Sequence, residues 1–448
     1  MRTPSGHIVS SSSAPHSMQS RLPNQLYTTI DEFKLESGAK LKDVTIAFTV
    51  SGRLNPLGTN AILICHALSG TADVADWWSS LFSRPRSALD LTKFCVICCN
   101  VLGSPYGSSS PLSIKPGSTS CYGSSFPKTT IRDDVRIQKH VMDILGVQSI
   151  YCIIGASMGG MVAMEWALHH GPRYVRSVVL ISTAARQSPW AIAWAENQRS
   201  TIKSDSRWRG GCYGDDPPVA GLAAARMAAM LSYRTYSSFE KRFGRRQIDV
   251  KVLERGPCNG YRSGQIGTCT DVGDIEAEGN PSPVFLAQSY LWYQGEKFNR
   301  RFDANCYVHI LDKIDTHDIS RGRCPHLCPS EAMKEVLKGM KQRALVIGVA
   351  SDGLYPIQEQ MELSEHIPNA QFAWMESDDG HDGFLLEGEQ MNNLLQLFFD
   401  RQPLVEEVPT CWKATRIPNI SPGETNHCLE TVQYAVETTD IMSYVGDW

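Results

Sequence analysis

The stretch YCIIGASMGGMVA constrains the fold of this chain more than any other part of the sequence. An apolar run of strand type, 150–154, meets a Gly-x-Ser-x-Gly motif around Ser157, and a helix-like run, 158–170, follows. The motif alone is weak evidence, because glycine is common enough for it to arise by chance. Between a strand and a helix, however, it predicts a tight turn that presents the serine and needs Gly155 and Gly159 to avoid collisions.

Further apolar runs have the length of buried strands, and helix-like stretches lie between some of them. The expected strands are 44–50, 61–66, 94–99, 150–154, 175–181 and 344–349, and the expected helices include 132–145 and 158–170. Strands that alternate with helices predict an α/β protein with a mostly parallel sheet and helices on both faces.

The alternation stops near Thr183 and resumes near Ala344, which predicts a mostly helical insertion between two strands of one sheet. At the carboxyl edge of such a sheet, an insertion lies over the site and acts as a lid. A Gly-rich stretch in it, 244–283, is expected to be an exposed loop. The expected segments are a disordered tail (1–27), a first part of the core (28–183), the helical lid (184–342), a second part of the core (343–400) and a C-terminal tail (401–448).

A serine hydroxyl needs a base and an orienting acid to act as a nucleophile, and behind this type of turn they follow in the order Ser, Asp, His. Asp352 ends the expected strand RALVIGVASD, and His381 follows on the loop SDDGHDGFLLE. We therefore predict Ser157, Asp352 and His381 as a catalytic triad. The rival acids are three aspartates that neighbour the histidine and do not end a strand: Asp378, Asp379 and Asp382.

Acyl transfer also needs hydrogen-bond donors for the oxyanion of the transition state. One is the backbone N–H of the residue after the nucleophile, Met158, and the other comes from an early strand-to-loop junction. The segment AILICHALSG is that junction, so Leu68 is predicted as the second donor. His66 in the same segment is interpreted as a structural residue.

Composition excludes several other classes of function. The net charge is −4 without long blocks of one sign, which does not favour a nucleic-acid or membrane partner. The first 25 residues lack the apolar segment of a secretory signal, and the 14 cysteines are interpreted as reduced residues of a cytoplasmic protein. Cys324 and Cys328 flank His326 but have no second pair nearby, so no metal site is predicted.

Several separate motifs between about Phe33 and Phe399 resemble the homoserine O-acetyltransferase family, a branch of the α/β-hydrolase fold, and its fungal members most. They read CHALSGTADVADWW, NVLGSPYGSSSP, FPKTTIRDDVRIQKHVMDILGV, GASMGGMVAMEW, DDPPVAGLAAARMAAMLSYRT, YQGEKFNRRFDANCY, DTHDISRGR and GHDGFLLE. The resemblance implies an α/β-hydrolase fold with a helical lid, and its triad falls on the same serine, aspartate and histidine. It differs from many members at Ala156, which stands where they carry glycine.

The resemblance also implies two substrate-binding residues. Arg226, in the motif GLAAARM, is expected to contact the carboxylate of an amino-acid substrate, and Asp382 its amino group. A guanidinium suits a carboxylate and an aspartate suits an ammonium, but the residue types alone would indicate solvated charges. A homodimer packed through the lid is expected on the same basis.

We predict an enzyme that moves an acetyl group from acetyl-CoA, as co-substrate, to the hydroxyl of L-homoserine through an acetyl-Ser157 intermediate, with no permanently bound cofactor. Such a reaction belongs to methionine biosynthesis, and relatives also act in secondary metabolism. The acceptor could instead be serine or a hydroxyl of a secondary metabolite, and the donor succinyl-CoA. A simple esterase with the same triad and a non-enzymatic binding protein of the same fold are the rival classes.

Overall fold

The structure is a computed structural model that describes residues 8–10, 22, 25–82, 87–248 and 283–402. Most of the predicted loop 244–283, most of the predicted N-terminal tail and nearly all of the predicted C-terminal tail lie outside these residues.

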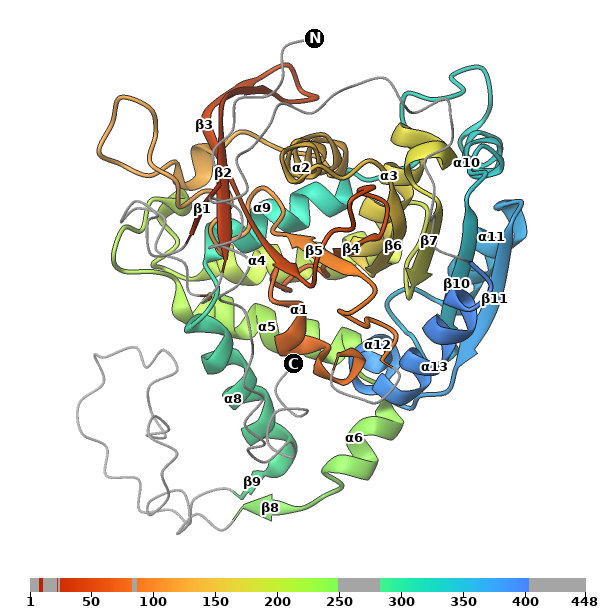
Figure 1. The fold of residues 1–448 in the computed structure, drawn as a ribbon. Coiled ribbons are helices and arrows are strands. Elements are labelled where there is room, and N and C mark those ends of the chain that lie inside the picture. The colour runs from red at the N-terminus through yellow and green to blue at the C-terminus, as the bar shows by residue number, and fades with distance from the viewer. Residues whose placement is uncertain (1–7, 11–21, 23–24, 83–86, 249–282, 403–448) are drawn as a thin grey trace, which may run out of the picture.

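A nine-stranded sheet forms the centre of the described part of the chain (Figure 1), in the order β1-β2-β3-β5-β4-β6-β7-β10-β11. Its strands are β1 (Val9–Ser10), β2 (Leu26–Lys34), β3 (Lys40–Ser51), β4 (Ala61–Cys65), β5 (Cys95–Cys99), β6 (Ile150–Ala156), β7 (Ser177–Ile181), β10 (Arg343–Val349) and β11 (Ala370–Met375). The strands β5, β4, β6, β7, β10 and β11 run parallel to one another, whereas the pairs β1–β2, β2–β3 and β3–β5 are antiparallel. The predicted mostly parallel sheet is thereby confirmed.

Helices follow most of the strands. They are α1 (Val74–Trp77), α2 (Ile131–Leu145), α3 (Met158–Tyr174), α4 (Pro189–Ser204), α5 (Val219–Tyr233), α6 (Tyr236–Arg242), α8 (Leu286–Asn299), α9 (Ala304–Asp315), α10 (Pro329–Lys338), α11 (Ile357–His366), α12 (Gly383–Leu386) and α13 (Gly388–Phe399). Short 3-10 turns include η3 (Ser79–Leu81) and η6 (Gly380–Asp382).

Two apolar cores lie on opposite faces of the sheet. One unites buried side chains of α2, α3, α10 and α11 with the residues of the strands that point to that face. The other unites α1, η3 and α13 with the residues that point to the opposite face. Because β6 is buried along its whole length, it has an apolar sequence, IYCIIGA, rather than an alternating one. Helices therefore cover both faces, as predicted.

Besides strands of only two residues, two longer strands were not predicted. β2 has the sequence LYTTIDEFK and β11 the sequence AQFAWM, and both are only partly buried. Polar residues interrupt their apolar pattern because one face is open to solvent. A further difference concerns the predicted disordered tail 1–27, since Val9 and Ser10 pair with Tyr27 and Leu26 at the edge of the sheet.

The segment between β7 and β10 is mostly helical in its described residues. α4 packs against α5 and α9, and α5 packs against α8. Figure 1 shows α4, α5 and α8 grouped on one side of the sheet, with α6 extending away from them. The two-residue strands β8 (Gln247–Ile248) and β9 (Val284–Phe285), which flank segment 249–282, pair with each other.

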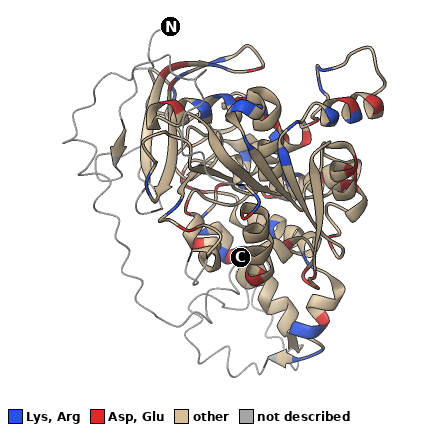
Figure 2. Ribbon diagram, turned by 45° about the vertical axis from the view of Figure 1, so that its right-hand side comes forward, with Lys and Arg blue, Asp and Glu red and all other residues tan. Residues whose placement is uncertain are grey.

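Charged residues of both signs are interspersed over these elements (Figure 2), and neither sign gathers on one large region in this view. Among the described helices, none combines the length and the apolar character needed to cross a membrane.

Candidate active site

Ser157 lies in a strained turn between β6 and α3. Its φ of 55° and ψ of −125° place a non-glycine residue at positive φ, which is costly and is kept only where the surrounding structure imposes it. A Cβ at Gly155 would lie 2.0 Å from the carbonyl oxygen of Gly159, and a Cβ at Gly159 would lie 1.9 Å from that of Cys65. The two motif glycines are therefore required by close backbone approach, as predicted.

The structure brings Ser157, His381 and Asp352 together, although they are far apart in the sequence. His381 Nε2 lies 2.9 Å from Ser157 Oγ, and His381 Nδ1 lies 2.8 Å from Asp352 Oδ2. Asp352 Oδ1 accepts the backbone N–H groups of Leu354 and Tyr355, each at 2.9 Å. Both carboxylate oxygens are thus engaged, so the orientation of the carboxylate toward the imidazole is fixed.

The environment of His381 suits a general base. Burial lowers the pKa of its imidazole, but the nearby carboxylate of Asp352 raises it more, and the net pKa lies above the ordinary value. The rings of Tyr233, Tyr355 and Phe384 surround the imidazole at centroid distances of 5.7, 5.4 and 5.6 Å. Since Asp352 accepts a hydrogen bond from Nδ1–H, Nε2 is left to accept the proton of Ser157.

The rival acids do not contact Nδ1 of His381, which is bonded to Asp352. Asp378 is exposed and pairs with Lys241, while Asp379 and Asp382 pair with Arg234. Asp352 is therefore the acid that the geometry selects.

Of the predicted oxyanion donors, Met158 follows the serine in the chain and Leu68 lines the same pocket. Met158 is the first residue of α3, so its N–H has no partner within the helix. His66 stays outside this group: its Nδ1 lies 2.8 Å from the carbonyl oxygen of Ala67, and its Nε2 accepts the N–H of Val101 at 3.2 Å. Burial lowers its pKa to about 4, which fits the predicted structural role.

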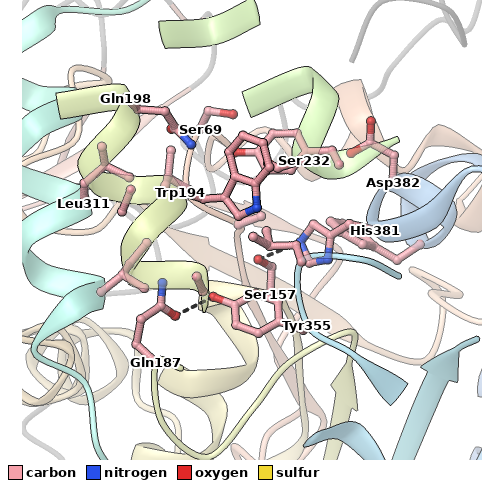
Figure 3. A pocket seen from close by; sticks show the side chains of 18 of the residues that line it. Ser69, Ser157, Gln187, Trp194, Gln198, Ser232, Leu311, Tyr355, His381 and Asp382 are labelled. Atoms are coloured by element: carbon pink, nitrogen blue, oxygen red, sulfur yellow. Dashed lines mark hydrogen bonds between the residues drawn. The ribbon is translucent and has the colours of Figure 1, made fainter. Parts of the chain in front are cut away.

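A pocket opens above the serine and contains about 730 Å³ of empty space, with solvent at its mouth included. Figure 3 shows the side chains of Trp194, Tyr355 and His381 arranged around Ser157. The other lining residues come largely from the segment between β7 and β10, among them Gln187, Gln198, Leu311 and Ile314. This segment therefore covers the site, at the position predicted for a lid.

Arg226 lines this pocket from α5, and its residue is only 4% exposed. Its guanidinium lies over the rings of Phe298 and Tyr233, at 5.1 and 5.8 Å from their centroids. Among the described residues it forms no ion pair, and its Nε has no hydrogen-bond partner. A buried guanidinium without a carboxylate partner destabilises the folded protein unless a bound anion pairs with it.

Asp382 also lines the pocket, at the end of η6. In Figure 3 its side chain lies on the side of His381 away from Ser157. Its Oδ2 accepts a hydrogen bond from Arg234 Nε at 2.8 Å. Neither predicted substrate-binding residue is a solvated charge, since Asp382 is 5% exposed.

Sequence reasoning missed Arg234 and the aromatic and amide residues of the pocket. Trp194 and Gln198 are four residues apart on α4, and Arg226 and Tyr233 are seven apart on α5, so each pair shares one helix face. This spacing was the only signal in the sequence, and it does not say what the face covers.

The described residues contain no group of three or more His, Cys, Asp or Glu side chains that could hold a metal ion. Cys324 and Cys328 are free thiols.

Comparisons with known proteins agree with this architecture. A family model described as alpha/beta hydrolase fold matches residues 60–388. Homoserine O-acetyltransferase FUB5 of Gibberella fujikuroi is 46% identical over 385 residues, which cover 84% of this chain and 87% of the relative. Homoserine O-acetyltransferase of Saccharomyces cerevisiae is 41% identical over 443 residues, which cover 87% and 89%.

Among solved structures, esterase E22 superimposes with a TM-score of 0.69 at 23% identity, covering 84% of this chain and 99% of the esterase. At that identity the likeness shows the fold alone. The sequence relatives go further, because their identity extends over most of both chains. The chain belongs to the homoserine O-acetyltransferase family of the α/β-hydrolase fold.

Proposed function

We propose that the protein transfers an acetyl group from acetyl-CoA to the hydroxyl of L-homoserine. The observation that carries this proposal is the pairing of a serine nucleophile with the unpaired, buried guanidinium of Arg226 in one pocket. An amino-acid acceptor supplies the carboxylate that this guanidinium lacks. The two curated relatives, both named homoserine O-acetyltransferases, support the same acceptor.

The first half of the reaction acylates the serine. His381 Nε2 takes the proton of Ser157 Oγ, and the oxygen attacks the thioester carbonyl. The N–H groups of Met158 and Leu68 stabilise the oxyanion, each by about 3 kcal/mol. The intermediate collapses, the carbon–sulfur bond breaks, and His381 returns the proton to the thiolate, so that coenzyme A leaves as a thiol.

In the second half, the hydroxyl of the acceptor gives its proton to His381 and attacks the acetyl-serine carbonyl. Collapse of the second intermediate breaks the bond to Ser157 Oγ, which regains the proton from His381. Arg226 holds the carboxylate and Asp382 the ammonium of the amino acid. Held in this way, the acceptor competes with water at about 55 M, because positioned groups reach far higher effective molarities.

The decisive experiment follows coenzyme A release from acetyl-CoA with a thiol reagent. The proposal expects release that depends on L-homoserine and exceeds the release with L-serine or larger alcohols. Succinyl-CoA in place of acetyl-CoA tests the donor. If acetyl-CoA is consumed equally with and without any acceptor, the protein is a hydrolase that transfers the acetyl group to water, and the proposal is wrong.

The Ser157→Ala variant tests the intermediate, since it should abolish release and leave no acetylated protein in mass spectra of acid-quenched samples. Ser204→Ala, an exposed serine in the last turn of α4, is the matched control and should behave as the wild type. Failure of a fluorophosphonate probe to label Ser157 would favour a binding protein without catalysis.

A further inference from the structure

Arg234 is a residue of the lid that directly follows α5, and it is buried against the loop that carries His381. Its Nη1 donates to Asp379 Oδ1 at 2.6 Å, and its Nε donates to Asp382 Oδ2 at 2.8 Å. Burial lowers the pKa of this guanidinium, but the carboxylates of Asp382 and Asp379 raise it more, so it stays charged. One side chain therefore joins two carboxylates of the same loop.

Other contacts fix this loop against the corner between α5 and α6. Ser238 Oγ donates to Asp379 Oδ1 at 2.5 Å, and Thr235 Oγ1 donates to the backbone carbonyl of Asp378. Gly380 has a φ of +64°, and a Cβ there would lie 2.7 Å from the carbonyl oxygen of Tyr233. The loop and the lid are thus in close contact at backbone level, Ser238 and Arg234 together hold Asp379, and Arg234 holds Asp382.

The charges of this cluster do not cancel. Arg234 carries one positive charge, and Asp379 and Asp382 together carry two negative charges. The cluster therefore retains a net negative charge, and Asp382 is its member that lines the pocket; among the described residues its hydrogen bond is made by Oδ2 and none by Oδ1. Arg226 carries the opposite charge elsewhere on the same pocket wall. This distribution matches a zwitterion.

We propose that Arg234 is a positioning residue that holds the Asp382 carboxylate with one oxygen turned to the ammonium group of the acceptor. This inference rests on the proposed function, because it needs an amino acid as the acceptor. A guanidinium fits the task since its Nε and Nη1 donors point in fixed, different directions and hold both carboxylates at once. A lysine, as a point charge, can orient only one of them.

The test compares two acceptors that differ only in the ammonium group: L-homoserine and 4-hydroxybutanoate. Their ratio of kcat/KM with acetyl-CoA as donor measures recognition of the ammonium. In Arg234→Met this ratio should fall by about 10- to 100-fold, the effect of one charge-assisted hydrogen bond. The fall should lie in KM for L-homoserine, while acylation by acetyl-CoA, measured as the first-turnover burst of coenzyme A, stays close to that of the wild type.

Arg234→Lys keeps the charge and should recover part of the ratio, which guards against a loss of folding in Arg234→Met. Lys241→Met is the matched control, because Lys241 pairs with Asp378 of the same loop but is exposed. It should leave the ratio unchanged.

The outcomes separate the two proposals. If the wild type does not prefer L-homoserine over 4-hydroxybutanoate, the proposal of an amino-acid acceptor is wrong, and so is the proposed role of Arg234. If the wild type shows the preference and Arg234→Met keeps it, only the role of Arg234 is wrong. Loss of the acylation burst in both Arg234 variants would show that the residue supports the fold rather than the ammonium site, and would also overturn the inference.

Discussion

Replacing Asp352 by asparagine should inactivate the enzyme by changing the tautomer of His381. Asp352 Oδ1 accepts two backbone N–H groups, those of Leu354 and Tyr355, and Oδ2 accepts His381 Nδ1–H. In the variant the amide oxygen must stay with the two N–H donors, so the NH2 group faces Nδ1. Nδ1 then has to accept a hydrogen bond, and the ring proton moves to Nε2, which faces Ser157.

An imidazole with its proton on Nε2 cannot take the proton of the serine. A tautomer change of this kind lowers kcat by about 10⁴-fold, or about 5.4 kcal/mol of transition-state stabilisation. The loss should appear in both half-reactions, because His381 is the base in each of them in the proposed mechanism. Coenzyme A release measures the whole reaction, and the first-turnover burst measures acylation alone.

The control is Asp378→Asn, which makes the same change in an exposed aspartate of the histidine loop. It should keep nearly wild-type rates. If Asp352→Asn retained more than about a tenth of the wild-type kcat, a loss below 1.4 kcal/mol, the reasoning from the two N–H donors would be refuted. Neither the negative charge of Asp352 nor the tautomer that it sets would then be needed for catalysis.

Two further predictions concern pH and stability. The rate should fall as the pH drops through the pKa of His381, because only the neutral imidazole acts as a base. Burial lowers this pKa, but the Asp352 carboxylate raises it more, so it lies above the ordinary value. A pH profile of kcat/KM without this fall, or with the fall below pH about 6, would contradict the prediction. Lys313 and Asp134 form a fully buried ion pair at 2.6 Å, so Lys313→Met should cost about 3–5 kcal/mol in unfolding by urea, whereas adding Asp134→Leu should restore much of the loss. A double variant as unstable as the single one would show that the pair matters through packing alone.

The triad was predictable because its determinants are local. A strand, a turn with Gly155 and Gly159, and a helix leave only one arrangement for the serine, since added Cβ atoms would collide with backbone. The order of the three residues along the chain then selects Asp352 and His381. The fold class followed in the same way, from apolar runs long enough to be buried strands.

The lid contacts were not predictable, because they depend on how helices from one segment pack over loops from another. Arg234 stands in the motif LSYRT, and its residue type alone suggests a solvated charge. It is buried because two carboxylates of a loop almost 150 positions later, Asp379 and Asp382, meet it. Arg226 and Asp382 were assigned through a family resemblance for the same reason, since no local pattern distinguishes a pocket charge from a surface charge.

The choice between transferase and esterase depends on the charges of the pocket rather than on the fold or the triad. Esterase E22 has the same fold, and a Ser-His-Asp triad serves hydrolysis as well as transfer. A site for neutral esters has no use for a guanidinium buried without a carboxylate, which costs several kcal/mol of stability. In this chain that cation, Arg226, shares the pocket with the net negative cluster around Asp382. A ligand with both charges offsets both costs, and in the proposed mechanism such a ligand, bound beside the acetylated serine, also occupies the place that water would need for hydrolysis.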